Sequence, residues 1–213
     1  MSEEAQKEEV TVIQFLESVA AGMATPGGGS VSALAGSLAS ALVEMVANLT
    51  LGKKDHDSHE TELQKIRDEA RSYREALTAT IAQDINAYQE VMNAFILPKT
   101  NEEEKRKRKE RIQKALKKAA DPPLFTAATS LKVIKLCQEA VEKGNPNTIS
   151  DAAVGALLAE AALLGGIFNV LINLSALEDK HFVEKMKKEL QRLEEEGGKI
   201  KEQIMAHVRT KIN

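Results

Sequence analysis

Thr25-Pro26-Gly27-Gly28-Gly29-Ser30 opens a run of small and apolar residues that continues to Thr50, and this stretch decides the fold. The three glycines predict a sharp turn, because glycine adopts positive φ and lets another group approach the main chain closely. The apolar run predicts a helix from about Ser30 to Leu51. The free N–H groups and the positive dipole end of a helix start favour an anion or a polar ligand. A plain turn between two helices explains the same glycines, so both interpretations stay open.

The composition is that of a helical protein without nucleic-acid chemistry. Hydrophobic residues make up 43% of the 213 residues, aromatic residues only 3%, and there is no Trp, which favours closely packed helices. The net charge is −3, with acidic and basic residues interleaved. Cys137 is the single cysteine, so we expect no disulfide and a reducing compartment. Met1–Glu9 is charged and lacks the apolar part of a signal peptide, so we expect a cytoplasmic protein.

Hydrophobic periodicity and end signals predict helices along the whole chain. The longest is expected over Ser58–Leu97, where apolar residues recur in steps of three and four and Pro98 ends the pattern. Further helices are predicted over Thr11–Ala21, Thr100–Ala120, Asp121–Lys143, Asp151–Ala176 and Asp179–Thr210. The sequence shows no strand pattern, repeat or linker. The predicted fold is all-α, a single domain over residues 1–213 built as a bundle of long antiparallel helices.

Two of the predicted helices, Ser30–Leu51 and Asp151–Ala176, are apolar nearly all round. Such helices lie either at the centre of a protein or in a membrane. The second carries Glu160 and Asn169 and lacks aromatic belts at its ends, so we expect no membrane span. Two such helices offer more apolar surface than one small bundle buries. We therefore expect a homodimer or a higher homo-oligomer.

Polar side chains interrupt both apolar helices at regular positions. In the first helix they form one stripe, made of Ser30, Ser37, Glu44 and Asn48. In the second helix Asp151 and Asn169 share a face but lie five turns apart, about 27 Å along the axis. These two side chains cannot touch one reacting atom. They can contact two ends of a long ligand or belong to two sites.

Asp84 is the acidic residue of interest on the long helix. Leu77, Ile81, Asp84 and Tyr88 follow in steps of four, three and four, which places Asp84 on the face that packs against other helices. A carboxylate there is costly unless it is paired or functional, and its pKa is expected to be shifted. A structural carboxylate bonded to a neighbouring helix explains the same position, so both alternatives remain.

Two segments contain metal-ligand residue types without the pattern of a metal site. Asp55-His56-Asp57-Ser58-His59-Glu60 lies in a polar link where Asp and Ser serve as helix caps. Glu178-Asp179-Lys180-His181 supplies one Glu-x-x-His, whereas a di-iron bundle needs two and two further glutamates. We therefore predict no metal.

A set of segments, in order along nearly the whole chain, adds a further indication. The set is Thr25–Ser30, Met45–Thr50, Gly52–Lys54, Asp84–Tyr88 with Leu97–Lys99, and Gly144–Ala152. Together these segments resemble the cyclodeaminase/cyclohydrolase family of folate enzymes. That family includes the C-terminal domain of formiminotransferase-cyclodeaminase and stand-alone methenyltetrahydrofolate cyclohydrolases. The charged segment Asn101–Lys118 and the tail from Leu177 are more similar to the stand-alone members.

The resemblance implies a dimeric helical bundle that acts on tetrahydrofolate derivatives without a metal or a separate cofactor. It implies a folate site formed by the glycine loop, Asp84 and the turn Asn147–Asp151. Asp84 and Asp151 are the expected catalytic residues. The expected substrate-binding residues are Pro26, Gly27, Gly28, Gly29, Ser30, Asn48, Lys53, Asn145, Asn147 and Ser150.

Two reactions are compatible with these residues. One is the hydrolysis of 5,10-methenyltetrahydrofolate to 10-formyltetrahydrofolate, and the alternative is the cyclodeamination of 5-formiminotetrahydrofolate. One carboxylate serves either reaction by stabilising a cation and moving a proton, and our hypothesis gives this role to Asp84. Lys53 and Lys54 are expected to attract the acidic tail of the substrate. A non-catalytic helical interaction protein is a further alternative, although it needs neither the glycines nor the polar stripe.

Overall fold

The computed structural model describes residues 10–53 and 58–212, and within these ranges the chain is helical with no strand. The helices are α1 (Val12–Ala20), α2 (Gly28–Thr50), α3 (Glu60–Phe95), α4 (Glu102–Ala119), α5 (Asp121–Lys143), the short 3₁₀ helix η2 (Pro146–Thr148), α6 (Ile149–Ser175) and α7 (Lys180–Ile212). The all-α prediction is confirmed, and the predicted helix ends lie within two residues of those observed. Residues 1–9 and 55–57, on which the signal-peptide and part of the metal predictions rest, lie outside the described ranges.

Side-chain caps mark the starts of α1 and α4. Thr11 caps α1 with a reciprocal capping box to Gln14, as its sequence predicts. The sequence Asp121-Pro122-Pro123 predicts an N-cap at Asp121 followed by proline at the first helical position, and this prediction is wrong. Ala120 holds the N-cap position, and Asp121 is the first helical residue because α5 follows α4 almost without a break.

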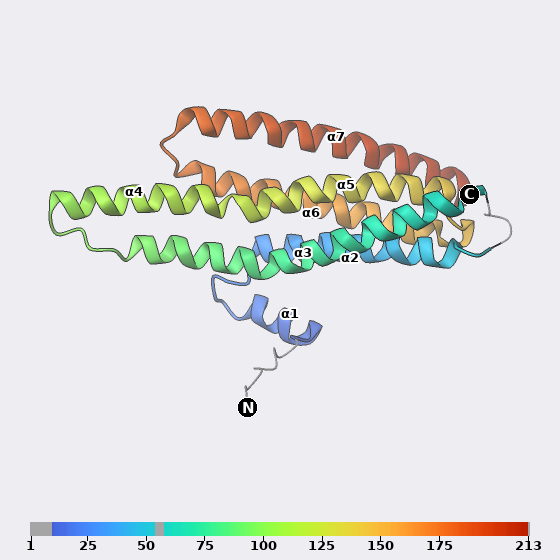
Figure 1. Cartoon of the computed structure of the whole chain (residues 1–213), viewed down its shortest axis with the longest axis horizontal. Coiled ribbons are helices and arrows are strands. Elements are labelled where there is room, and N and C mark those ends of the chain that lie inside the picture. Colours follow the sequence, from blue (N-terminus) through green and yellow to red (C-terminus); the bar gives the residue numbers. More distant parts are fainter. Residues whose placement is uncertain (1–9, 54–57, 213) are drawn as a thin grey trace.

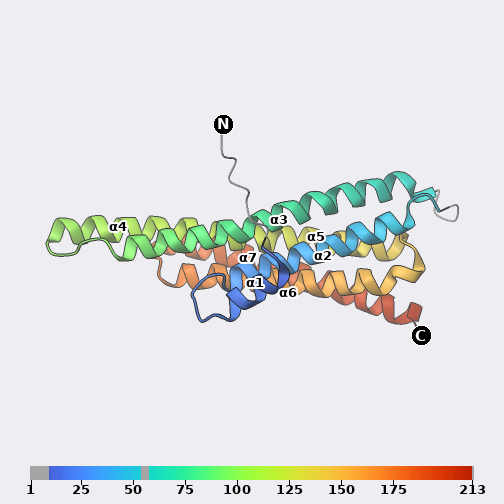
Figure 2. The same cartoon turned by 90° about the horizontal axis from the view of Figure 1, so that it is seen from below.

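The two apolar helices, α2 and α6, lie side by side in the bundle, as their composition predicts. α3 and α5 pack on α2, while α5 and α7 pack on α6 (Figures 1 and 2). α3 and α4 extend together beyond the other helices at one end (Figure 1). α1 stands apart from the bundle and has no buried residue.

The polar stripe of α2 is largely an interface with α3. The hydroxyl groups of Ser37 and Thr78 lie 2.8 Å apart. Two turns further on, the Glu44 carboxylate accepts hydrogen bonds from Arg71 at 2.8 Å and Arg74 at 2.9 Å. Burial alone would raise the pKa of Glu44, but the hydrogen bonds and charges of the two arginines outweigh it and lower the pKa. Most of the stripe therefore fixes the register of α2 against α3.

Candidate active site

Asp84 lies beside the first turn of α2. Ser30 is fully buried there, and its hydroxyl group donates a hydrogen bond of 2.9 Å to Oδ2 of Asp84. Asp84 comes from the middle of α3, so the contact joins two helices that are far apart in the sequence. At this helix start, where the sequence predicts an anion or a polar ligand, the structure places the carboxylate of Asp84.

The glycine loop does not use positive φ, which corrects the sequence-based expectation. Gly27 is the N-cap of α2 with a φ of −124°, and Gly28 and Gly29 are already helical. Within the described residues, the glycines with positive φ are Gly22 and Gly52.

The glycines are explained instead by the side chains that approach them. A Cβ atom on Gly29 would overlap the Asp84 carboxylate. A Cβ atom on Gly28 would lie 3.2 Å from Nδ2 of Asn169, a distance that leaves little room. Gly28 therefore leaves room for Asn169 of α6, and Gly29 leaves room for Asp84 of α3.

A cavity of about 400 Å³ opens at this place. Its polar side chains are Asp84, Asn169 and Asn173, with Thr25 at the loop. The remaining lining is mainly apolar and aromatic and comprises Ala24, Gly27, Gly28, Gly29, Tyr88, Val91, Phe95, Leu116, Ala119, Ile172 and Ala176. An apolar cavity with a few convergent polar groups is typical of a small-molecule site.

Asp84 is the one charged side chain among the described residues that line the cavity. Burial raises the pKa of Asp84, and the hydrogen bonds from Ser30 only partly oppose this effect. Within the described ranges no basic side chain forms an ion pair with Asp84. The carboxylate is therefore available to a cationic group or a proton of a ligand.

Asn169 and Asn173 line the cavity. The sequence suggests Asn169 only as one end of a long ligand site or as part of a separate site, and it assigns Asn173 no role. Nδ2 of Asn169 donates to the carbonyl oxygen of Gly165 at 2.8 Å. Nδ2 of Asn173 donates to the carbonyl oxygens of Asn169 at 2.8 Å and Ala119 at 3.2 Å. Two amides one turn apart in an apolar helix were the sequence signal that marked this face.

The turn from Asn145 to Asp151 lies at the opposite end of α2. The main-chain N–H of Asn145 donates to Oγ1 of Thr50, the last residue of α2, at 2.9 Å. A helix of 23 residues is about 34 Å long, so this turn is remote from Asp84 within one chain. The Asn145 side chain accepts a hydrogen bond from the main-chain N–H of Asn147 at 3.1 Å, so it stabilises its own turn.

The other predicted site residues divide between the two ends. Asn48, Lys53 and Ser150 are exposed, and Asp151 is half-buried, all at the far end of α2 and the start of α6. Pro26 lies in the loop that leads into the cavity. Within one chain, the structure brings together the glycine loop, Ser30 and Asp84, and leaves the second cluster separate.

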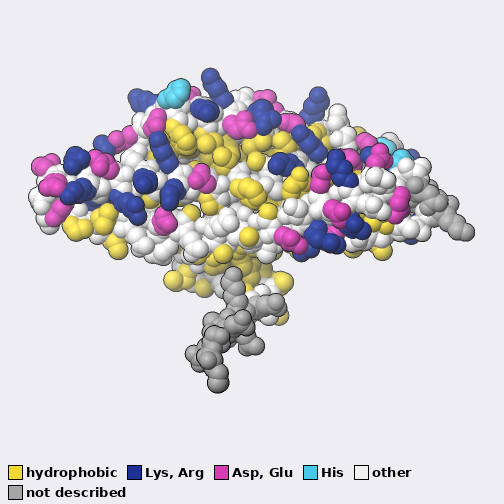
Figure 3. Space-filling model, in the orientation of Figure 1, with side chains coloured by type: hydrophobic (Ala, Val, Ile, Leu, Met, Phe, Trp, Pro, Cys, Tyr) yellow, Lys and Arg dark blue, Asp and Glu magenta, His cyan; other side chains and the backbone are white. Residues whose placement is uncertain are grey.

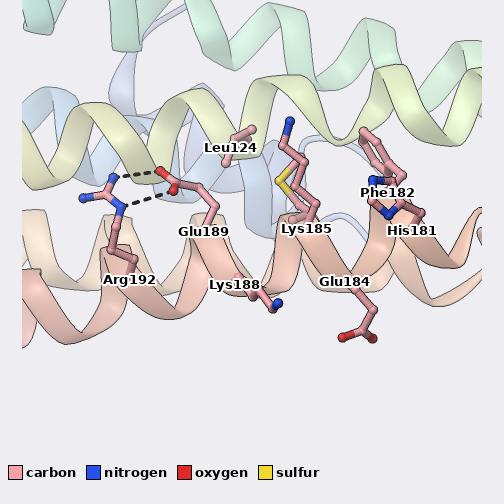
Figure 4. Close-up of a pocket in the computed structure, with 9 residues that line it drawn as sticks. Leu124, His181, Phe182, Glu184, Lys185, Lys188, Glu189 and Arg192 are labelled. Atoms are coloured by element: carbon pink, nitrogen blue, oxygen red, sulfur yellow. Dashed lines mark hydrogen bonds and ion pairs between the residues drawn. The ribbon is translucent and has the colours of Figure 1, made fainter.

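A larger hollow of about 720 Å³ lies between α5 and α7 (Figure 4). Arg192 pairs with Glu189 at 2.7 Å, and Lys188 and Glu184 point away from α5 in this view. Among the described lining residues none belongs to the predicted site. Its charges are paired or face solvent, so the smaller cavity is the better candidate.

The described ranges contain no group of three or more His, Cys, Asp and Glu side chains arranged to hold a metal ion. Of the two segments with metal-ligand residue types, His59 contacts Glu62 at 2.9 Å and Asp179 pairs with Lys117 at 2.6 Å.

Comparison with known proteins assigns the family. The family model described as formiminotransferase-cyclodeaminase matches residues 11–192. The chain is 42% identical to the methenyltetrahydrofolate cyclohydrolase of Methylorubrum extorquens over 95% of this chain and 98% of that protein. It is 33% identical to the formimidoyltransferase-cyclodeaminase of Rattus norvegicus over 86% of this chain, but spans only 34% of that longer protein.

The fold of a solved relative agrees with the sequence matches. The formiminotetrahydrofolate cyclodeaminase of Thermotoga maritima superposes with a TM-score of 0.88 at 30% identity, covering 97% of this chain and 99% of that one. The matches in sequence and in structure both extend over the helices that form the cavity. The chain therefore belongs to the formiminotransferase-cyclodeaminase family.

Proposed function

We propose that this protein hydrolyses 5,10-methenyltetrahydrofolate to 10-formyltetrahydrofolate, with Asp84 as the catalytic carboxylate. The observation that carries the proposal is an unpaired, half-buried carboxylate in a cavity whose other walls are neutral. The substrate carries a positive charge at its bridging carbon, and this charge can pair with the Asp84 carboxylate, which has no basic partner among the described residues. The similarity to the Methylorubrum protein, over nearly the full length of both chains, favours this reaction.

The reaction needs one group that moves a proton. Water attacks the cationic carbon between N5 and N10, and Asp84 accepts a proton from the attacking water. The bond between this carbon and N5 then breaks, and Asp84 returns the proton to N5. The hydroxyl group on the carbon loses its proton to solvent and becomes the formyl oxygen. The net products are 10-formyltetrahydrofolate and one proton.

Because the bridging carbon is already electrophilic and no electrons are transferred, we propose that the reaction uses neither a metal nor a separate cofactor. The expected cytoplasmic location fits this role, since it keeps the enzyme with soluble folates. Asp151, Asn48, Lys53 and the Asn145–Ser150 turn are not needed for the proton transfer. Within one chain they lie about 34 Å from Asp84, beyond the reach of a folate bound there, so we assign them no contact with that substrate molecule.

A second candidate is the cyclodeamination of 5-formiminotetrahydrofolate. The observation that favours it is the structural match to the Thermotoga cyclodeaminase. In this reaction N10 attacks the formimino carbon and ammonia leaves. Asp84 would then hold the formiminium cation and carry the proton to the leaving nitrogen.

We also propose that two copies of the chain associate through α2 and α6. Exposed apolar side chains line both helices, namely Val31, Leu38 and Leu49 on α2 and Val154, Leu157, Phe168 and Ile172 on α6. Only 56% and 44% of the most apolar parts of these helices are buried in one chain. Both helices are long and apolar enough to cross a membrane, but Asp151 and Glu160 on α6 favour a protein partner over lipid.

α1 adds to the surface that a second copy would cover. Its apolar residues Val12, Ile13 and Leu16 are 59–72% exposed, and hydrophobic side chains gather at the edge of the molecule where α1 lies (Figure 3). A helix of nine residues is too short to be stable by itself, so it needs a packing partner. Ile172 belongs both to the exposed face and to the cavity, so a second copy would also close the cavity.

A paired spectrophotometric assay tests the reaction. The methenyl compound absorbs in the near ultraviolet and the open forms do not. A protein-dependent fall of the signal with methenyltetrahydrofolate supports the hydrolase, and a rise with 5-formiminotetrahydrofolate supports the cyclodeaminase. Rates equal to the spontaneous rates in both assays would contradict the proposal and favour the alternative, a non-catalytic helical interaction protein.

A further inference from the structure

We infer that Asn169 and Asn173 recognise the N–H-bearing pyrimidine edge of the bicyclic ring of the substrate and so position its one-carbon group at Asp84. This inference rests on the proposed function, because it concerns how the same cavity holds its ligand. The two asparagines are positioning residues and take no part in proton transfer.

The orientation of both amides is fixed by their partners. Nδ2 of each asparagine faces main-chain carbonyl oxygens, which accept hydrogen bonds and cannot donate them. A flipped amide would place two acceptors against each other. Oδ1 of each side chain is therefore the free atom in the cavity, with no donor from the described residues.

The cavity presents an unusual set of hydrogen-bonding groups. Nδ2 of Asn173 has both hydrogens engaged, so this side chain can only accept. Asn169 has one engaged hydrogen and can accept while donating once. The Asp84 carboxylate and the two free amide oxygens are acceptors, so the part of a ligand that meets them must carry N–H groups. A ring with an amino group and a neighbouring ring N–H and carbonyl has this pattern.

The positions of the polar groups suit a flat bicyclic ring. Asn169 contacts α2 at Gly28 and Asp84 contacts it at Gly29, and consecutive Cα atoms are only about 3.8 Å apart. Tyr88, Phe95 and other apolar side chains form the walls. One rigid ring system can thus meet the amides with its pyrimidine edge and present the atoms near N5 to Asp84.

The test compares the normal substrate with 2-desamino-5,10-methenyltetrahydrofolate, which lacks the exocyclic amino group. For the unaltered protein we expect the analogue to have a KM about tenfold higher and a kcat within about threefold, because an acceptor is left without its donor. Asn173→Leu and Asn169→Leu should raise the KM of the normal substrate and bring the two KM values close together. Asn93→Leu, an exposed asparagine of α3, is the matched control and should keep the original ratio.

Equal KM values for both compounds with the unaltered protein would overturn the inference, as would variants that keep the original ratio. If a leucine variant fails to fold, the comparison on the unaltered protein decides alone. If the unaltered protein turns over neither compound, the proposed function fails. In that case, calorimetry compares the dissociation constants of 5-formyltetrahydrofolate and its 2-desamino counterpart. A Kd about tenfold higher for the 2-desamino compound supports the inference. If neither compound binds, the inference is overturned.

Discussion

At the scale of the residue, Asp84 is held in a position that suits its proposed chemistry and costs the fold stability. Burial raises its pKa, so the folded chain disfavours the charged form that is present near neutrality. The contribution of Asp84 to the free energy of unfolding is therefore fully present below the ordinary Asp pKa of about 3.9. It is lost as the pH rises through the raised pKa that Asp84 has in the folded chain.

Asp84→Asn should accordingly unfold at the same temperature as the unaltered protein or a higher one at pH 7. The amide oxygen still accepts the hydrogen bond from Ser30, while the cost of a buried charge is removed. The gain should shrink as the pH falls through the raised pKa of Asp84 and be absent below about 4, where this carboxyl group is neutral in both the folded and the unfolded chain. Thermal unfolding of both proteins, followed by circular dichroism at pH 7 and at a pH below about 4, measures the difference in melting temperature. A clearly lower melting temperature at pH 7 would mean that the charge stabilises the fold.

Gly29 is predicted to tolerate no side chain. Gly29→Ala places a methyl group against the Asp84 carboxylate, which must move, so we expect a loss of about 1–3 kcal/mol of stability and most of the activity. Gly198→Ala is the matched control, because nothing lies within 4 Å of the added methyl group in the middle of α7. That variant should be stabilised by about 0.5–1 kcal/mol with full activity. Urea unfolding and turnover assays measure both, and equal behaviour of the two variants would contradict the account.

At the scale of the element, the contact of α2 with α3 fixes where Asp84 stands. Glu44 is the polar anchor of that contact and is 13% exposed, while Arg71 and Arg74 are 50% and 36% exposed. Glu44→Gln should therefore cost only about 1 kcal/mol at pH 7. The Glu44 pKa is lowered in the folded state, so this contribution is present above the ordinary Glu value and is lost as the pH falls through the lowered one. Urea unfolding should show a smaller difference between the two proteins at pH 3 than at pH 7, and an equal difference at both pH values would contradict this prediction.

The elements were largely predictable from the sequence because their signals are local. The three-and-four spacing of α3, the capping box of Thr11 and the proline after α3 each depend on neighbouring residues. The pairing of the polar stripe with α3 was not predicted, because spacing shows that residues share a face but not which helix covers it. The sequence shows the stripe, whereas its partners on α3 follow only from the packing of the two helices.

The site was half predictable for the same reason. The family resemblance joins the glycine loop, Asp84 and the turn Asn147–Asp151 in one site. The cavity contains the glycine loop and Asp84 together with Asn169 and Asn173, and not that turn. Positive φ was the wrong explanation of the glycines, since glycine in a sequence indicates either a backbone conformation or a close approach. Only the approach of Asp84 and Asn169 decides between them.

At the scale of the whole molecule, a single chain leaves the apolar face of α2 and α6 exposed to solvent. Phe168 is 66% exposed on this face, so Phe168→Glu should convert a dimer to a monomer while keeping the helix content. Phe125→Glu changes a phenylalanine of α5 that is 43% exposed and should leave the mass in solution unchanged. Sedimentation equilibrium measures the mass. A monomeric unaltered protein would contradict the proposed dimer.

The most direct test of the central claim is the turnover of methenyltetrahydrofolate by the unaltered protein and by Asp84→Asn, each above the spontaneous rate. We expect a folded variant whose rate falls by at least about a hundredfold, since a positioned acid–base group contributes about 10²–10⁴-fold. Near-unaltered turnover by a folded Asp84→Asn variant would contradict the claim that this carboxylate, brought to α2 by two glycines, performs the chemistry.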